Sequence, residues 1–304
     1  MLKRPILITG IHNSGSTWLG RMIALSKEVG YIHEPFNINN KFNPCLGRLK
    51  YWYTYINENN EKDFYECIKK NLKYKKNIIR PLVSIGNISD LKYYFRYEGE
   101  LMFSKISNRR PLFKDPIALF SVDWLERKFN FIPIILIRHP AAFIASIKKR
   151  NWKHPFSHFV MQDELINGSL IKYKYDIMEF ARNEYSIVEQ GILLWNIIYS
   201  QVLEYQNKHH EWSFIKYENL ANNPIEELSE IYNYLELDYT NEIQEKIKIY
   251  TGLSQNKTLL YKKMIRNSSS NIFYWKNYLS EEEIDEIFSG VKEISSNFYS
   301  DEEW

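Results

Sequence analysis

The stretch that decides the fold lies near the start of the chain and reads Pro5-Ile6-Leu7-Ile8-Thr9-Gly10-Ile11-His12-Asn13-Ser14-Gly15-Ser16-Thr17. It opens with a short apolar run, which is typical of a buried strand. A glycine-containing loop follows, and residues 17–27 have the pattern of a helix. Strand, glycine loop and helix N-terminus in this order direct backbone N–H groups and the positive end of the helix dipole at an anion. The stretch therefore predicts a phosphate-binding loop.

This loop differs at one position from the nucleoside triphosphate loop G-x-x-x-x-G-K followed by Ser or Thr. Ser16 stands where that loop has its lysine. A triphosphate hydrolase uses the lysine at the β- and γ-phosphates and the following hydroxyl on magnesium. We therefore expect a ligand with fewer phosphates and no metal. A plain strand–turn–helix connection with incidental glycines is the alternative interpretation.

Apolar runs alternate with helical patterns along the chain, which predicts an α/β fold with a central parallel β-sheet flanked by helices. The segment Ile132–Ile137 is apolar throughout, as expected of a strand covered on both faces. The other expected strands are residues 5–9, 28–33, 111–114 and 212–217, and the expected helices are residues 17–27, 116–128, 140–150, 178–206, 224–236, 240–250 and 280–297. Because no linker-like stretch divides the chain, we expect one domain over residues 1–304, with insertions at 38–110 and 151–175.

The composition excludes several function classes. The 304 residues include 40 Lys and Arg against 37 Asp and Glu, a net charge of +3, so a dedicated nucleic-acid binder is not expected. No run approaches the ~18 apolar residues of a membrane helix, and the N-terminal run is too short for a signal peptide. Cys45 and Cys67 cannot by themselves build a disulfide framework or a zinc site. We expect a soluble protein of a reducing compartment, the cytoplasm.

A second anion site is predicted where the apolar segment Ile132–Ile137 ends. Arg138 follows that strand directly, at the carboxyl end where open α/β sheets bind their ligands. Pro140 suits the first turn of the next helix, and Ser146 lies about two turns into it, able to face the same side. Arginine offers a fixed fork to phosphate, and serine adds a neutral hydrogen bond. The alternative is an arginine paired with a carboxylate at the sheet edge.

Together the two motifs resemble the sulfotransferase family that uses 3′-phosphoadenosine 5′-phosphosulfate (PAPS), most closely its bacterial and carbohydrate-type members. In that family a loop of Lys or Arg, Ser-Gly, and two Ser or Thr residues holds the 5′-phosphosulfate, and an Arg with a Ser eight residues later holds the 3′-phosphate. Similar stretches are Tyr31–Phe36, Phe113–Pro116, Lys216–Leu220 and Trp275–Lys276. The resemblance implies PAPS as co-substrate, PAP (its desulfated product), no metal, and a donor site made of Asn13, Ser14, Gly15, Ser16, Thr17, Trp18, Arg138, Ser146 and Arg266.

One residue departs from the family pattern. The first loop position, usually Lys or Arg, is Asn13, whose amide can donate a hydrogen bond but cannot neutralise charge. Either another cation replaces it, for which His12, His33 and Lys114 are the nearby candidates, or activity is reduced or lost. Of these we predict His12 and Lys114 as the charge stabilisers. A helix-loop histidine bound to backbone and a lysine paired with a carboxylate are the alternatives.

In-line sulfuryl transfer also needs a base beside the acceptor hydroxyl. Glu34 follows the second expected strand, so it reaches the same edge of the sheet as the loop, and we predict it to be that base. An ion-paired or capping glutamate is the alternative interpretation.

Aromatic residues make up 16% of the chain and include 23 Tyr and 8 Trp. They gather in the insertions, as Tyr51-Trp52-Tyr53, Tyr55, Tyr93-Tyr94-Phe95, Tyr97, Trp152 and Phe156. Because aromatic faces stack on sugars, we predict a carbohydrate or glycolipid acceptor; filling of the core is the alternative. The run Tyr51–Tyr53 cannot face one side of any regular element, so at least one member faces solvent, a ligand or a partner.

Two other functions fit parts of the sequence. A P-loop small-molecule kinase would fit the loop, but Ser16 and the lack of an Asp-ended apolar strand for magnesium argue against it. A non-catalytic protein that binds PAP, PAPS or another nucleotide would fit the uncharged Asn13.

Overall fold

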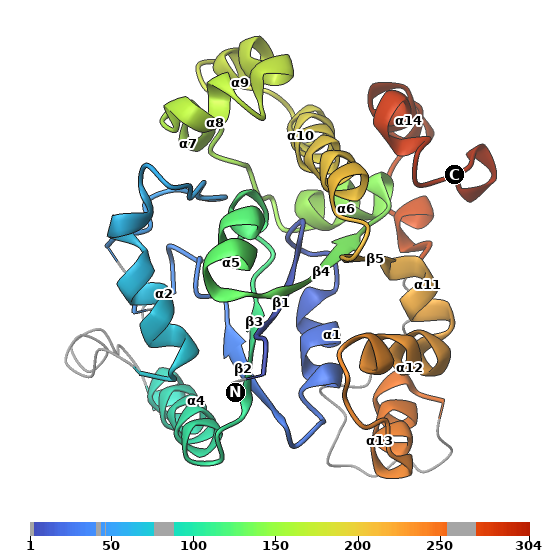
Figure 1. Cartoon of the computed structure of the whole chain (residues 1–304). Helices are drawn as coiled ribbons and strands as arrows, with labels where there is room; N and C mark the ends of the chain where they lie inside the picture. The colour runs from blue at the N-terminus through green and yellow to red at the C-terminus, as the bar shows by residue number, and fades with distance from the viewer. Residues whose placement is uncertain (1–2, 41–43, 46, 76–87, 254–271) are drawn as a thin grey trace.

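A central sheet of five parallel strands organises the computed structural model, which describes residues 3–40, 44–45, 47–75, 88–253 and 272–304 (Figure 1). The strands are β1 (Ile6–Gly10), β2 (Val29–His33), β3 (Arg110–Lys114), β4 (Ile132–Ile137) and β5 (Ser213–Lys216), in the order β2-β3-β1-β4-β5. This confirms the predicted fold class. The bounds of β4 match the predicted ones, and each other strand lies within one or two residues of its prediction.

Successive side chains of each strand point to opposite faces of the sheet, so each face has its own apolar core. The core that contains Leu7 and Ile135 is covered by α5 (Val122–Phe129), α6 (Pro140–Lys149), α10 (Ile187–Lys208) and α14 (Glu281–Ser295). The core that contains Ile8 and Ile134 is covered by α1 (Ser16–Ile23), α12 (Pro224–Tyr234) and α13 (Asn241–Thr251). Helices on both faces explain why the central strand β4 is apolar throughout.

The remaining helices border the sheet or belong to the insertions. They are α2 (Tyr65–Leu72), α4 (Ile88–Ile106), α7 (Ser157–Val160), α8 (Asp163–Asn167), α9 (Lys174–Phe180) and α11 (Tyr217–Asn222). In Figure 1, α2 and α4 lie beside β2, and α7 to α9 form a separate group above the sheet. Across the described residues, no helix combines the length and apolarity needed to span a membrane.

Three predicted helices have different bounds in the structure, each for a local reason. The helix predicted over 17–27 ends at Ile23, and the Ser26 hydroxyl then accepts a hydrogen bond from the Glu28 N–H. The helix predicted over 116–128 begins as a 3-10 turn, Leu119–Ser121. The helix predicted over 178–206 is two helices, because Ser186 and Glu189 form a capping box that starts α10 afresh.

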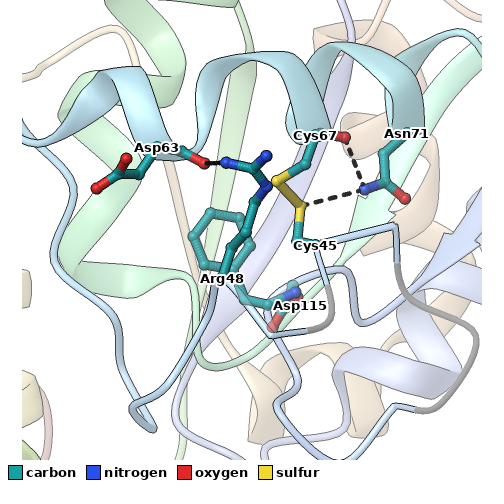
Figure 2. The surroundings of a disulfide bond; sticks show 7 residues. Cys45, Arg48, Asp63, Cys67, Asn71 and Asp115 are labelled. Carbon is teal, nitrogen blue, oxygen red and sulfur yellow. Dashed lines mark hydrogen bonds between the residues drawn. A yellow bond between two sulfur atoms is a disulfide. The ribbon is translucent and has the colours of Figure 1, made fainter.

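The insertion between β2 and β3 is closed by a disulfide between Cys45 and Cys67, whose Cα atoms are 5.2 Å apart (Figure 2). The bridge joins the segment before α2 to α2 itself. Asn71 on α2 donates a hydrogen bond to the Cys67 carbonyl at 3.1 Å. Two cysteines make no disulfide framework, as expected, but they do make one cross-link, which is unusual in the reducing compartment expected from the sequence.

Candidate functional site

The predicted phosphate loop runs from the end of β1 to the start of α1, and its two glycines are required by the surrounding backbone and side chains. Gly10 has φ 143°, and a Cβ there would lie 2.5 Å from the Leu136 carbonyl oxygen. Gly15 has φ 91°, and a Cβ there would lie 2.3 Å from the Tyr217 ring. No side chain caps α1, so its first N–H groups can bind a ligand.

A cleft of about 970 Å³ opens in front of this loop, at the carboxyl edge of the sheet. It is lined by His12, Asn13, Gly15, Ser16, Thr17, Trp18, Glu34, Asn37, Asn39, Trp52, Pro116, Ile117, Arg138, Ser146, Lys149, Arg150, Trp152, Tyr217 and Tyr274. The fold thus brings the loop, the end of β2 and the end of β4 to one cavity. Among the predicted site residues, Ser14 and Lys114 are buried and do not line it, and Arg266 lies outside the described residues.

Arg138 is held rigidly at one end of the cleft. Its guanidinium carbon lies 3.8 Å from the centre of the Tyr217 ring, and its Nε lies 3.7 Å from a carboxylate oxygen of Glu218. Its backbone N–H donates to the Tyr199 hydroxyl at 2.8 Å, and its carbonyl accepts from Trp195 Nε1 at 2.9 Å. Arg138 therefore fits both interpretations of the sequence: it lines the cleft, and it also pairs with a carboxylate.

Three residues that line the cleft carry a buried polar atom with no hydrogen-bond partner among the described residues: His12 Nε2, Trp18 Nε1 and Arg138 Nε. An unsatisfied buried polar group costs about 1–3 kcal/mol, so a cluster of them beside a cavity indicates groups that a ligand satisfies. An indole N–H and a guanidinium N–H can both donate to oxygen. This donor set fits a phosphate or sulfate ester.

Glu34 and Lys114 form an ion pair at the opposite end of the cleft. The Lys114 ammonium donates directly to Glu34, which also accepts from Asn37 Nδ2 at 2.6 Å. Burial alone would raise the pKa of Glu34, but the charge of Lys114 and the hydrogen bonds from Lys114 and Asn37 outweigh it and hold that pKa below its usual value. Glu34 is therefore a carboxylate, and its φ of 44° is a strained backbone conformation of the kind found at functional sites.

His12 is next to Asn13 but carries no charge at physiological pH. Burial first, and the positive charge of Arg150 second, lower its pKa to about 3. Its Nδ1 lies 3.1 Å from the Tyr53 hydroxyl, and its ring centre lies 4.1 Å from that of Trp152.

The other candidates to replace the loop cation are also unsuited to that role in this structure. Burial, and after it the Lys114 charge, lowers the pKa of His33 to about 4, so this histidine is neutral too. Lys114 is fully buried and directed at Glu34. The predicted candidates therefore lie near the loop, but none presents a positive charge to it.

The residues of the aromatic run Tyr51–Tyr53 face different sides, as their spacing predicts. Trp52 lines the cleft, whereas Tyr53 is fully buried. Trp52 meets Trp152 edge to face, with ring centres 5.7 Å apart, and Trp152 also lines the cleft. Tyr97 and Phe156 belong to the core, so core filling explains part of the aromatic content.

Sequence reasoning assigned no role to several residues that the structure places at the site. Tyr217 and Glu218 lie in the stretch Lys216–Leu220, and its resemblance to the family could have identified them. Lys149, Arg150 and Tyr274 also line the cleft. The first two are ordinary helix-end cations by pattern, and only the folded chain brings them to the cleft that the loop also lines.

Comparison with known proteins agrees with this geometry. The family model described as "Sulfotransferase family" matches residues 5–241, well over half of the chain. None of the curated proteins matches the chain.

Among solved structures, the chain is similar to the sulfotransferase domain of the curacin biosynthetic pathway, at 16% identity and a TM-score of 0.47, covering 96% of this chain and 98% of that one. It is also similar to the sulfotransferase domain of the Synechococcus PCC 7002 olefin synthase (13%, TM-score 0.45, coverage 98% and 96%). A third is mouse sulfotransferase SULT7A1 complexed with PAP (14%, TM-score 0.45, coverage 99% and 86%). The assignment rests on the family match and on the two motifs that face one cleft. The chain belongs to the sulfotransferase family and is a PAPS-dependent sulfotransferase.

Proposed function

We propose that this enzyme transfers the sulfuryl group of PAPS to a hydroxyl group of a carbohydrate or glycolipid, in line and without a metal. The observation that carries the proposal is that the phosphate loop, Arg138 with Ser146, and the carboxylate of Glu34 all line one cleft. In-line transfer requires donor, acceptor and base to meet in this way.

On the donor side, residues 13–18 hold the 5′ end of the nucleotide, and Arg138 and Ser146 hold its 3′-phosphate. The unpartnered Trp18 Nε1 and Arg138 Nε fit this assignment, because both residues line the cleft and each atom is a donor that a phosphate or sulfate oxygen satisfies. PAPS supplies the sulfuryl group and leaves as PAP. The protein holds the two phosphate ends apart and leaves the sulfate toward the middle of the cleft.

On the acceptor side, Glu34 accepts the proton of the attacking hydroxyl. Its lowered pKa keeps it ionised at physiological pH, so it is always in the form that a base requires. Lys114 acts through Glu34, by holding the carboxylate in place and in its charged form. His12 is a neutral hydrogen-bonding group with an unpartnered Nε2.

The acceptor class follows from the aromatic wall of the cleft. Trp52 comes from the insertion at 38–110 and Trp152 from the insertion at 151–175, and both line the cavity. Flat aromatic faces stack on sugar rings while their edges contact hydroxyl groups. We propose that the two insertions of this one domain shape the acceptor half of the cleft.

The cellular compartment of this protein stays a prediction, because two observations favour different compartments. The composition favours the cytoplasm, whereas a Cys45–Cys67 disulfide is typical of an oxidising compartment. Alkylation of the protein's thiols in intact cells, read as a mass shift with and without prior reduction, separates the two.

The function is tested in two steps. Stabilisation by PAP in the absence of magnesium, measured as a thermal shift, tests the donor. Transfer of radiolabelled sulfate from PAPS to a panel of glycans and glycolipids, with simple phenols as the matched control, tests the acceptor. Transfer to phenols alone would contradict the carbohydrate acceptor, and PAP binding without any transfer would favour the non-catalytic alternative.

A further inference from the structure

The phosphate loop carries no cationic side chain, because Asn13 stands where the family has Lys or Arg and His12 is neutral. Three described residues with a positive charge line the cavity: Arg138, Lys149 and Arg150. Arg138 is already committed to Glu218 and Tyr217 at one end. The remaining two lie at the C-terminal end of α6.

Arg150 is placed toward the donor by its position on α6. It is the residue that caps the helix, four positions after Ser146, and residues four apart lie on the same face of a helix. Both line the cleft. Arg150 therefore extends the wall that begins with Arg138 and Ser146.

The segment that follows Arg150 is packed against the phosphate loop. Asn151 turns the chain with a φ of 48°, and the Trp152 N–H donates to the Ile147 carbonyl at 3.0 Å. This turn places the Trp152 ring 4.1 Å, centre to centre, from the ring of His12, the residue before Asn13. The charge of Arg150 accordingly reaches His12 and helps to lower its pKa.

Arg150 also has no competing partner. Its side chain is exposed, and no carboxylate pairs with it within the described residues. Two neighbouring cations are engaged: Lys148 pairs with Glu283 at 2.5 Å and Lys153 pairs with Glu184 at 3.3 Å. A charged arginine that faces a cavity rich in unpartnered donors is suited to an anion.

We propose that Arg150 binds the 5′-phosphosulfate end of the donor and supplies the positive charge that Asn13 does not. The inference rests on the proposed donor, PAPS. Arginine is suited to this role because its planar fork stays charged and matches the oxygens of phosphate and sulfate. The cation thus comes from the end of α6 instead of from the loop.

Binding of two nucleotides to wild type and to variants tests the proposal without an activity assay. Isothermal titration compares PAP with adenosine 3′-monophosphate, which lacks the 5′-phosphate, on wild type, Arg150→Ala and the length-matched Arg150→Gln. We expect both variants to lose roughly tenfold in PAP affinity, the size of one charge-assisted contact, with unchanged affinity for adenosine 3′-monophosphate. The control Lys153→Ala, a nearby paired cation outside the cleft, should change neither affinity.

Restoring the charge at the loop completes the test. Asn13→Lys in the Arg150→Ala background should recover PAP affinity, because the family's usual cation then replaces the one removed. An equal loss for both nucleotides, or a loss that Asn13→Lys does not recover, would overturn the role of Arg150 while leaving PAP as a ligand. Wild type that binds neither nucleotide would instead overturn the proposed donor.

Discussion

Two ion pairs lie at the carboxyl edge of the sheet, and they are oriented in opposite ways relative to the cleft. In the pair at the ends of β2 and β3, the carboxylate of Glu34 lines the cavity and Lys114 is buried behind it. In the pair at the ends of β4 and β5, Arg138 lines the cavity and Glu218 is buried behind it. One end of the cleft therefore presents negative charge and the other presents positive charge.

The opposite orientations of the two ion pairs indicate how the fold separates donor binding from acceptor activation. The buried partner of each pair fixes the position of the partner that faces the ligand, and Lys114 also keeps Glu34 ionised. A carboxylate beside the donor phosphates would repel them, so the base belongs at the end remote from Arg138. The polarity of the cleft supports the proposal that the nucleotide binds at the Arg138 end and the acceptor hydroxyl at the Glu34 end.

Replacing the carboxylate at the negative end should have the largest effect. Glu34→Gln keeps the shape but removes the base, and we expect turnover to fall about 10²- to 10⁴-fold. PAP affinity should change little, because Glu34 does not face the phosphates. Steady-state transfer and PAP titration on the same preparation measure the two quantities. Unchanged turnover would remove Glu34 from the role of base.

The disulfide belongs to the Glu34 end alone, since both cysteines lie between β2 and β3. The double variant Cys45→Ser/Cys67→Ser opens a loop with a sequence separation of 22 residues. The chain-entropy model gives a loss of about 3 kcal/mol in the free energy of unfolding, measurable by urea denaturation. Turnover should fall more than PAP affinity. The reverse order would show that the bridge supports the donor end.

Removing the cation at the positive end should weaken the donor. Arg138→Ala removes a phosphate contact and leaves Glu218 buried without its partner, and we expect PAP binding to weaken by about 2–3 kcal/mol. Titration calorimetry measures this loss. Affinity for adenosine 3′-monophosphate should fall equally, because Arg138 is assigned to the 3′-phosphate. If Arg138→Ala instead weakened PAP but not adenosine 3′-monophosphate, Arg138 would bind the 5′-phosphate and Arg150 the 3′-phosphate.

The buried member of the negative pair can be tested by its effect on pH dependence. Lys114 lowers the pKa of Glu34, so Lys114→Met should raise that pKa. The acid limb of the turnover–pH profile should then move to higher pH, while wild type keeps its turnover to lower pH. A variant that merely lost structure would lower turnover at every pH and leave the limb in place.

Much of this site could be predicted from the sequence because its signals are local. The apolar run of β4 defines a strand buried on both faces, and Arg138 and Ser146 follow from where that strand and the next helix begin. The glycine loop is local in the same way. Glu34 and Lys114 could each be placed at a strand end, but their pairing depends on β2 and β3 being neighbours in the sheet.

The features that sequence reasoning missed are contacts between distant segments. Two cysteines separated by 22 positions carry no signal of their distance in space, and only the packing of α2 brings them together. Arg150 is an ordinary basic residue at a helix end until the contact of Trp152 with His12 places it beside the loop. The charge of His12 was mispredicted for a related reason, because burial is a property of the fold.

The two ends can finally be compared by their response to acid. His12 lies at the loop beside Glu34, and His139 follows Arg138; burial, with nearby positive charge, lowers the pKa of each to about 3. In the unfolded chain both titrate near the ordinary histidine pKa of about 6.5. Between these values the unfolded state binds more protons, so stability is full above about pH 6.5 and is lost as the pH falls toward 3.

Each histidine contributes a slope of up to about 1.4 kcal/mol per pH unit in that window. We expect His12→Gln and His139→Gln each to reduce the slope of the unfolding free energy against pH between pH 6 and pH 4. The reduction corresponds to at most one bound proton, and urea denaturation at a series of pH values measures it. Because His139 stacks on Trp275 at 5.0 Å, its replacement should also cost stability at neutral pH. A variant with the wild-type slope would mean that its histidine is protonated in the folded protein, and that end of the cleft would then carry one more positive charge than the structure assigns to it.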